Sequence, residues 1–393
     1  LREKPEQFRP KTTEGMNSHV TRIVLTGGPC AGKTTALARL VEHFSNRGYA
    51  VFTQPEAATL FHQSGANFRT DNPSLFKEIE LQLLKFQLNF EDNLYSIASV
   101  TGQPALVLYD RGVMDIAAYL PAGLWQELLC ETGFSEVDLR DRRYEAVLHL
   151  CTAAKGAEAY YTCDNNNSRK ESPEEAVRID DRLISAWTGH PHLRVIGNET
   201  GFEGKIRRVI GEITTILGDP EPVECERKFL VEVLETPPDG VQSEISQTYL
   251  LPHNGQELRI RKRGRNGNYV YFHTSKRTVS AGRRVEVERQ ISSGEYAELK
   301  RSADPDKQTI RKIRNCFVYD NQYFELDTFL EPKLPHSLLE LEGSPDAHIH
   351  FPPFLKVVAE VTSDENYNNS RIADKKRGVM ATSGIFQGKT ADR

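Results

Sequence analysis

The residues with the clearest chemistry lie near the start of the chain, in the segment 22–35. A short β-branched run leads into Gly27, and Gly32, Lys33 and Thr34 complete the spacing G-x-x-x-x-G-K-[ST]. Glycines let successive backbone N–H groups turn toward one phosphate, and the helix expected next points its positive end there. Lys33 can then reach the β- and γ-phosphates, while the Thr34 hydroxyl can ligate Mg²⁺. We therefore predict a nucleotide-phosphate site made by Gly27, Gly28, Pro29, Cys30, Ala31, Gly32, Lys33, Thr34 and Thr35.

Two acidic residues follow strand-like runs and are candidates for the same site. Glu56 comes just past the run 49–53, and Asp110 ends the apolar run 105–109. The carboxyl ends of parallel strands meet at one edge of a sheet, where α/β folds bind ligands. We interpret Asp110 as a Walker B aspartate that holds Mg²⁺, rather than as an ordinary strand-terminal residue. Glu56 is a candidate base or metal-shell residue, and a solvated loop glutamate is the alternative.

Two arginines lie on a helix expected over residues 173–187. Arg178 and Arg182 are four positions apart and therefore share one face of that helix. In P-loop kinases this region forms a lid whose arginines close on the transferring phosphate. The hypothesis competes with a simpler one, in which both arginines are solvated surface residues.

The elements around these residues alternate between strand and helix patterns. Further strands are expected at 146–150 and 193–196, and helices at about 75–100 and 202–217. The apolar stripe of the first of these helices is predicted to be core: Leu75, Ile79, Leu83, Phe86, Phe90 and Leu94. The alternation predicts a parallel sheet with helices on both faces. Residues 20–217 resemble the P-loop kinase-like ATPase group that includes nicotinamide riboside and deoxynucleoside kinases, through the phosphate loop, Pro55-Glu56 and Asp110-Arg111.

Length and composition restrict the class of protein. The 393 residues favour two domains, and 50 Lys+Arg against 55 Asp+Glu disfavour a general nucleic-acid binder. The six cysteines form no C-x-x-C pair, which argues against a disulfide framework or a zinc knuckle. No apolar run approaches the ~20 residues that span a bilayer. A cytoplasmic location is expected, and residues 1–20 are interpreted as a flexible N-terminal segment.

From residue 223 the pattern changes to strands that carry a charge at every second position. One interpretation is an open antiparallel sheet with a solvated face. However, like charges adjoin on one face, which costs energy unless opposite charge lies between them. The second interpretation is a closed barrel that turns its charges inward, filled by a polyanion and divalent metal. Carboxylates would hold Mg²⁺ or Mn²⁺, and arginine and lysine would take phosphate oxygens.

These strands resemble the CYTH domain, also called the triphosphate tunnel fold, over residues 223–376. The E-x-E-x-K signature stands at Glu224, Glu226 and Lys228, and the remaining charged groups follow in the family's order. The resemblance implies that the metal-shell residues are Glu224, Glu226, Asp327, Glu340 and Glu342. It implies that the phosphate ligands are Lys228, Arg259, Arg261, Lys276, Lys312 and Arg314.

The order of the two halves, a kinase-like P-loop domain (21–218) and a CYTH domain (223–376), resembles the TRPL translocation defect protein 14 family, and residues 377–393 are expected to form a tail. That resemblance implies a GTP-binding protein that binds phosphoinositides or other acidic phospholipids, contacts membranes peripherally and acts in trafficking of TRP-type channels. The chain contains no N-K-x-D tetrapeptide, so GTP rather than ATP rests on the resemblance. The alternative is an enzyme, a nucleoside or nucleotide kinase joined to a metal-dependent hydrolase of tripolyphosphate or nucleoside triphosphate.

Overall fold

The computed structural model describes residues 19–158, 161, 172–218, 226–238, 240–253, 256–280, 283–342 and 348–375. Glu224, the linker 219–222 and the predicted C-terminal tail lie outside these ranges, as do residues 1–18 of the predicted N-terminal segment. We call residues 19–218 the P-loop half and residues 226–375 the antiparallel half. None of the described helices is long and apolar enough to cross a bilayer. Cys30, Cys130, Cys151 and Cys316 are free thiols.

The P-loop half contains a five-stranded parallel sheet in the order β2-β3-β1-β4-β5, which confirms the predicted α/β fold. The central strand β1 pairs with β3 on one side and β4 on the other. The carboxyl ends of these three strands therefore lie together, beside the start of the phosphate loop. The strands are β1 (Val20–Thr26), β2 (Ala50–Gln54), β3 (Ala105–Asp110), β4 (Ala146–Leu150) and β5 (Leu193–Ile196).

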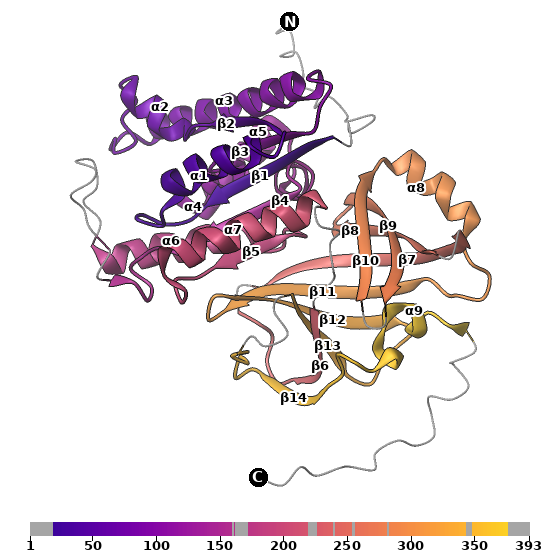
Figure 1. Ribbon diagram of the computed structural model, residues 1–393. Coiled ribbons are helices and arrows are strands. Elements are labelled where there is room, and N and C mark those ends of the chain that lie inside the picture. The colour runs from indigo at the N-terminus through magenta and orange to yellow at the C-terminus, as the bar shows by residue number, and fades with distance from the viewer. Residues whose placement is uncertain are drawn as a thin grey trace, which may run out of the picture.

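Helices cover both faces of this sheet (Figure 1). One core cluster joins α1 and α7 to one face, and a second joins α3, α4, α5 and the end of α6 to the other. A π-helical turn, η1 (Val137–Asp141), precedes β4. The helices are α1 (Lys33–Ser45), α2 (Ala57–Gln63), α3 (Pro73–Ser99), α4 (Val113–Tyr119), α5 (Ala122–Thr132), α6 (Pro173–Trp187) and α7 (Gly201–Leu217).

The predicted apolar stripe of α3 is partly wrong. Leu75 is 47% exposed and Phe86 is 37% exposed, so neither is a core residue. The helix is rotated to bury polar groups, because Glu91 accepts hydrogen bonds of 2.8 Å from both Tyr144 Oη and Arg143 Nε. A buried carboxylate that is paired in this way is tolerated in a core. The buried residues of α3 are Glu80, Leu81, Leu83, Leu84, Gln87, Leu88, Glu91 and Ala98.

The antiparallel half is one nine-stranded sheet in the order β10-β9-β8-β7-β11-β12-β13-β6-β14. All of its pairings are antiparallel, with short connections between most neighbours. The strands are β6 (Glu226–Val233), β7 (Val241–His253), β8 (Gln256–Arg265), β9 (Asn268–Ser280), β10 (Arg283–Ile291), β11 (Ile310–Tyr319), β12 (Gln322–Glu331), β13 (Ser337–Glu342) and β14 (Leu355–Glu360).

This sheet is curved (Figure 1), and the charged residues at every second position of its strands share one face. Charged side chains on that face are buried, including Arg259 at 8%, Arg314 at 5% and Asp327 at 0% exposure. The apolar side chains of the other face pack beneath α8 (Ser293–Leu299) and the segment 349–355. The apolar cluster under α9 (Asn369–Ile372) lies on the charged face instead, because its members Leu230, Phe329 and Leu338 are two positions along their strands from Lys228, Asp327 and Glu340. Strands β10 and β14 are the two edges, and no pairing joins them within the described ranges. Closure of the sheet into a barrel therefore stays a prediction.

The two halves pack directly against each other. The backbone carbonyl of Gly189 accepts a buried hydrogen bond of 2.6 Å from Arg263 Nη2 of β8. Val137 of the π-helical turn forms an apolar cluster with Val270 and Phe272 of β9. Buried hydrogen bonds and apolar packing of this kind hold the halves in one arrangement.

Candidate functional site

The phosphate loop, residues 27–35, has the backbone shape of an anion cradle. Gly27 has φ +141°, and a Cβ there would lie 2.1 Å from the carbonyl oxygen of Leu150. Gly32 has φ +86° and begins α1 without any side-chain cap, so the first N–H groups of the helix are available to an anion. Lys33 Nζ donates to the carbonyl of Gly27 at 2.8 Å and to that of Gly28 at 3.3 Å. The lysine is therefore already folded back over the loop, where a β- or γ-phosphate would lie.

The surroundings of Lys33 lower the pKa of its ammonium group. Burial and, after it, the neighbouring Arg111 lower the pKa of its ammonium group to about 8, against the opposing effect of Asp110 and Glu56. Loss of solvent penalises the charged form of a lysine. A bound phosphate would restore the favourable charge, so this lysine is suited to bind an anion.

Asp110 ends β3 and lies beside this lysine with an unused oxygen. Its Oδ1 atom is buried and has no hydrogen-bond partner among the described residues. Burial raises the pKa of Asp110, and the nearby carboxylates of Glu56 and Asp115 raise it as well, against the effect of Lys33. A buried carboxylate oxygen without a donor is costly unless a cation satisfies it. The position fits Mg²⁺, which Asp110 and the exposed hydroxyl-bearing Thr34 would hold together.

The simpler interpretation, a solvated loop glutamate, does not describe Glu56, because both of its carboxylate oxygens accept hydrogen bonds. Its Oε1 atom accepts from Arg111 Nε at 2.5 Å, and its Oε2 atom accepts from Thr59 at 2.8 Å. Burial would raise the pKa of Glu56, but Arg111 and Lys33 lower it overall. The same arginine contacts Asp115 at 3.3 Å. The structure thus brings Glu56, Asp110 and Lys33 to one edge of the sheet, and Arg111 bridges Glu56 and Asp115.

Arg178 and Arg182 lie on the exposed face of α6. Together with Glu175 and Asp181 they line a pocket of about 370 Å³. No hydrogen bond or ion pair joins either arginine to the phosphate loop in the described part of the chain. The shared face is as expected, and the lid role stays a prediction.

The opposite face of α6 carries a residue that pattern reasoning missed. Asp180 is fully buried, and its Oδ1 atom accepts from the backbone N–H of Gly28 at 2.8 Å and of Thr152 at 3.1 Å. The same oxygen lies 3.0 Å from Nε2 of His149, while Lys155 Nζ lies 2.9 Å from Oδ2. Its sequence signal was an aspartate among the apolar positions of an amphipathic helix. Asp180 thereby fixes the phosphate loop to α6.

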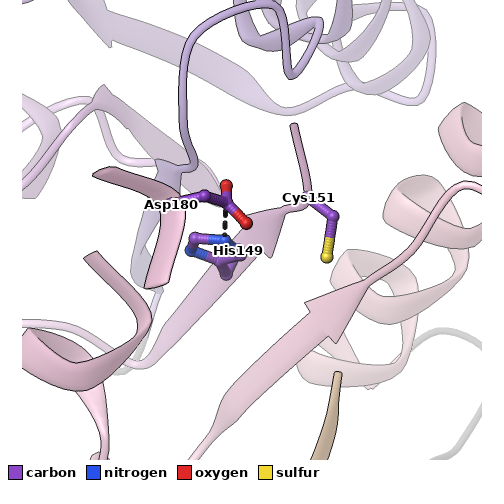
Figure 2. Close-up of side chains that lie close together, drawn as sticks. All are labelled: His149, Cys151 and Asp180. Atoms are coloured by element: carbon purple, nitrogen blue, oxygen red, sulfur yellow. Dashed lines mark hydrogen bonds and ion pairs between the residues drawn. The ribbon is translucent and has the colours of Figure 1, made fainter. Parts of the chain in front are cut away.

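His149, Cys151 and Asp180 have the residue types of a metal site, and their ligand atoms lie within 4.8 Å of one another. Figure 2 shows the imidazole and the carboxylate facing each other, while the thiol points away from both. Burial, with Asp180 nearby, raises the pKa of Cys151 to about 12, so the thiol is neutral. The ammonium group of Lys155 already neutralises Asp180. The cluster therefore supports the loop and does not fit a metal ion.

In the antiparallel half the predicted metal and phosphate residues contact one another. Asp327 is bound by Lys312 Nζ at 2.5 Å and by Arg314 Nη2 at 2.6 Å. Arg314 also contacts Glu340 at 2.7 Å, and Glu325 through Nη1. A buried arginine with three carboxylate partners is the centre of this network.

The other predicted residues of this half form two further groups. Lys228 Nζ lies 2.7 Å from Glu226 and 3.5 Å from Glu340. On the neighbouring strands, acids that the prediction left out pair with the remaining cations. Glu286 contacts Arg259 at 2.6 Å and Lys276 at 2.7 Å, and Glu288 contacts Arg261 at 2.6 Å.

Glu342 differs from the other predicted metal residues. Its carboxylate pairs with Arg194 of β5, in the P-loop half. Glu224 lies outside the described residues. The remaining carboxylates are hard oxygen donors, as Mg²⁺ and Mn²⁺ require, so the residues present fit divalent metal.

The fold and the geometry of residues 20–217 are those of a P-loop nucleotide-binding domain. Residues 22–205 match the model of the AAA domain family. No curated protein matches the chain.

Three solved structures illustrate what the chain is similar to. An inorganic triphosphatase is 31% identical, with 38% of this chain and 93% of that chain covered, at a TM-score of 0.29. Deoxyadenosine kinase from M. mycoides with bound dATP is 14% identical, with coverage of 49% and 99% and a TM-score of 0.33. Thymidylate kinase from Ehrlichia chaffeensis is 16% identical, with coverage of 49% and 98% and a TM-score of 0.33.

Proposed function

We propose that the chain binds two phosphorylated ligands, a magnesium nucleotide at the phosphate loop and a polyphosphate on the charged face of the antiparallel half. The observation that carries the first site is the preformed loop with Lys33 folded over it, next to the unpartnered oxygen of Asp110. A cradle of N–H groups, one cation and one free carboxylate oxygen is what a nucleotide with bound Mg²⁺ requires.

The second site is supported by its ion pairs, in which each cation could exchange its carboxylate partner for a phosphate. Lys312 and Arg314 form ion pairs with Asp327, and Arg259 forms one with Glu286. A phosphate group that takes these cations leaves buried carboxylates without counter-ions, which is strongly unfavourable. Divalent cations that enter with the polyphosphate would take the released carboxylates. The network therefore favours a polyphosphate bound with Mg²⁺ or Mn²⁺ over a bare anion.

The finer identity of the ligands follows the resemblance to the TRPL translocation defect protein 14 family. We propose GTP at the phosphate loop and the headgroup of a phosphoinositide, or of another acidic phospholipid, on the charged face. A clustered set of arginines and lysines suits adjacent phosphates on one headgroup. Peripheral contact with membranes, a role in trafficking of TRP-type channels and the domain boundaries at 21–218 and 223–376 belong to the same proposal.

Calorimetry with the full chain tests the two sites. We expect Mg-GTP or Mg-ATP and tripolyphosphate with Mn²⁺ to bind independently, each at one site. Lys33→Ala should weaken nucleotide binding at least about 100-fold, because the cation over the loop is lost, and should leave tripolyphosphate binding unchanged. Arg259→Ala should have the reverse effect. Lys85→Ala, an exposed change on α3, is the control.

Each of the two sites can be disproved by its own variant. Nucleotide binding that survives Lys33→Ala would sink the first site, and tripolyphosphate binding that survives Arg259→Ala would argue against the second. For the lipid proposal, vesicles of phosphatidylcholine with about 5% phosphoinositide are compared with phosphatidylcholine alone, with and without Mn²⁺, at the low ionic strength that favours surface attraction. Equal sedimentation with both vesicles would exclude the headgroup proposal.

The second candidate function is enzymatic. Glu56 is held ionised beside Lys33 and close to Asp110, an arrangement that can orient an acceptor hydroxyl for phosphoryl transfer from the nucleotide. Labelled ATP or GTP with a panel of nucleosides tests this function. Turnover at roughly 1–100 per second would favour a kinase over a binding protein. Release of phosphate from tripolyphosphate with Mn²⁺ would favour a hydrolase in the antiparallel half.

A further inference from the structure

The segment 188–194 runs from the end of helix α6 into β5 and lies along the antiparallel half. Figure 1 shows β5 and α7 on the side of the P-loop half that faces the second sheet. Gly189 and His190 accept hydrogen bonds through their carbonyls from Arg263 at 2.6 Å and Tyr323 at 3.2 Å. His192 Nε2 lies 3.9 Å from Glu288 of β10. This segment therefore touches several strands of the charged sheet.

Arg194, at the end of this segment, contributes a cation to the other half. Its Nη2 atom binds Glu342 Oε2, and its Nε atom lies 3.2 Å from Glu212 of α7. Glu342 lies opposite Glu226 in the register of β13 and β6. One arginine of the P-loop half thus neutralises a carboxylate beside the first acid of the charged face.

This ion pair differs from the others on that face. Glu226, Asp327 and Glu340 are neutralised by lysine or arginine of their own sheet. Those cations can turn to a phosphate bound on the face. Arg194 belongs to a different sheet and is also held by Glu212 of α7.

We propose that Arg194 is a positioning residue of the second site, which keeps Glu342 out of the set of metal ligands and so limits how tightly the site holds divalent cations. This inference rests on the proposed function of the charged face. It makes the metal affinity of one half dependent on a side chain of the other.

The test is a calorimetric titration of the full chain with MnCl₂ alone, supported by spin-resonance counting of free Mn²⁺. Arg194→Gln frees Glu342, and we expect Mn²⁺ to bind at least about tenfold more tightly because one positive charge near the acids is removed. Arg194→Lys keeps the charge and should behave as wild type. Arg207→Gln, an exposed change on α7, is the matched control.

A second variant keeps the test decisive if Arg194→Gln does not fold. Glu342→Gln in the otherwise unchanged chain should leave Mn²⁺ affinity within about twofold, because Arg194 already occupies that carboxylate. A tenfold loss would overturn the inference, as would an Arg194→Gln protein that folds and binds Mn²⁺ as wild type does. Failure of the proposed function has a different signature, since wild-type protein would then bind no tripolyphosphate with Mn²⁺.

Discussion

At the scale of single residues, the phosphate loop depends on a balance of charge around Lys33. Burial and Arg111 lower the pKa of its ammonium group, and the carboxylates of Asp110 and Glu56 raise it. Without ligand the ammonium group is satisfied by two loop carbonyls, those of Gly27 and Gly28. A phosphate competes with neutral acceptors rather than with an ion pair, which lowers the cost of binding.

This balance predicts how nucleotide binding depends on pH. The pKa of Lys33 in the free protein is about 8, and phosphate binds the charged form. Affinity should therefore be constant near pH 7 and fall as pH rises through 8, by about tenfold for each further unit. Titrations of Mg-ATP between pH 7 and 9.5 measure this, with tripolyphosphate as the internal comparison. A flat profile across that range would contradict the assigned role of the lysine.

At the scale of elements, helix α6 has one exposed face and one face that packs against the phosphate loop. Its exposed face carries Arg178 and Arg182, and its buried face carries Asp180, which binds the N–H of Gly28 in the phosphate loop. A Cβ on Gly28 would lie 2.9 Å from the Asp180 carboxylate, so the helix and the loop are in direct contact. A movement of α6 would therefore change the shape of the phosphate loop.

Replacement of Asp180 should disturb both stability and ligand binding. Asp180→Ala leaves two backbone N–H groups buried without an acceptor and removes one of the two carboxylates that bind Lys155, and we expect a loss of about 2–4 kcal/mol in the free energy of unfolding. Nucleotide affinity should fall at least about tenfold because the loop is no longer fixed. Asp181→Ala is the matched control, since that exposed carboxylate shares Lys155 but not the loop.

Urea unfolding and calorimetry with Mg-ATP give the two readouts. The control should change stability by less than about 1 kcal/mol. If Asp180→Ala loses stability while its nucleotide affinity equals that of Asp181→Ala, Asp180 is a structural residue only.

At the scale of the whole molecule, buried polar contacts join a parallel sheet to a curved antiparallel one. Arg263 is 1% exposed and donates from β8 to the carbonyl of Gly189, while Tyr323 of β12 donates to His190. The segment that receives these bonds follows directly after α6. Nucleotide-dependent movement of α6 would thus reach the charged face through a short, covalently continuous path.

The contact between halves predicts cooperative unfolding. We expect one transition by differential scanning calorimetry for the wild-type chain. Arg263→Met removes the buried donor and should separate the transitions, with a loss of about 1–3 kcal/mol from the orphaned Gly189 carbonyl. Arg265→Met, two residues on and exposed at the end of β8, is the control. Two transitions already present in the wild type would show that the halves unfold independently.

Local pattern was sufficient for much of this protein. The phosphate loop depends on glycine spacing and on a strand and helix within about 25 residues, so its residues and the parallel α/β fold around it were predictable. The alternating charges of the second half likewise predicted an antiparallel sheet with its charges gathered on one face. The rotation of α3 was not predictable, because it depends on Tyr144 and Arg143, which lie more than fifty residues from the Glu91 that they bind.

The tertiary structure decided which charges neutralise which. Asp180 binds a loop residue 152 positions away, and Arg194 binds a carboxylate 148 positions away. No periodicity carries that information, since a spacing of two or 3.6 residues specifies a face and not a partner. By itself the sequence determined that the chain has a phosphate loop and a face of clustered charge. Only the fold decided that Asp180 of α6 fixes the phosphate loop and that Arg194 of the first half pairs with Glu342 of the second. Each of these pairings requires two distant segments of the chain to be packed together.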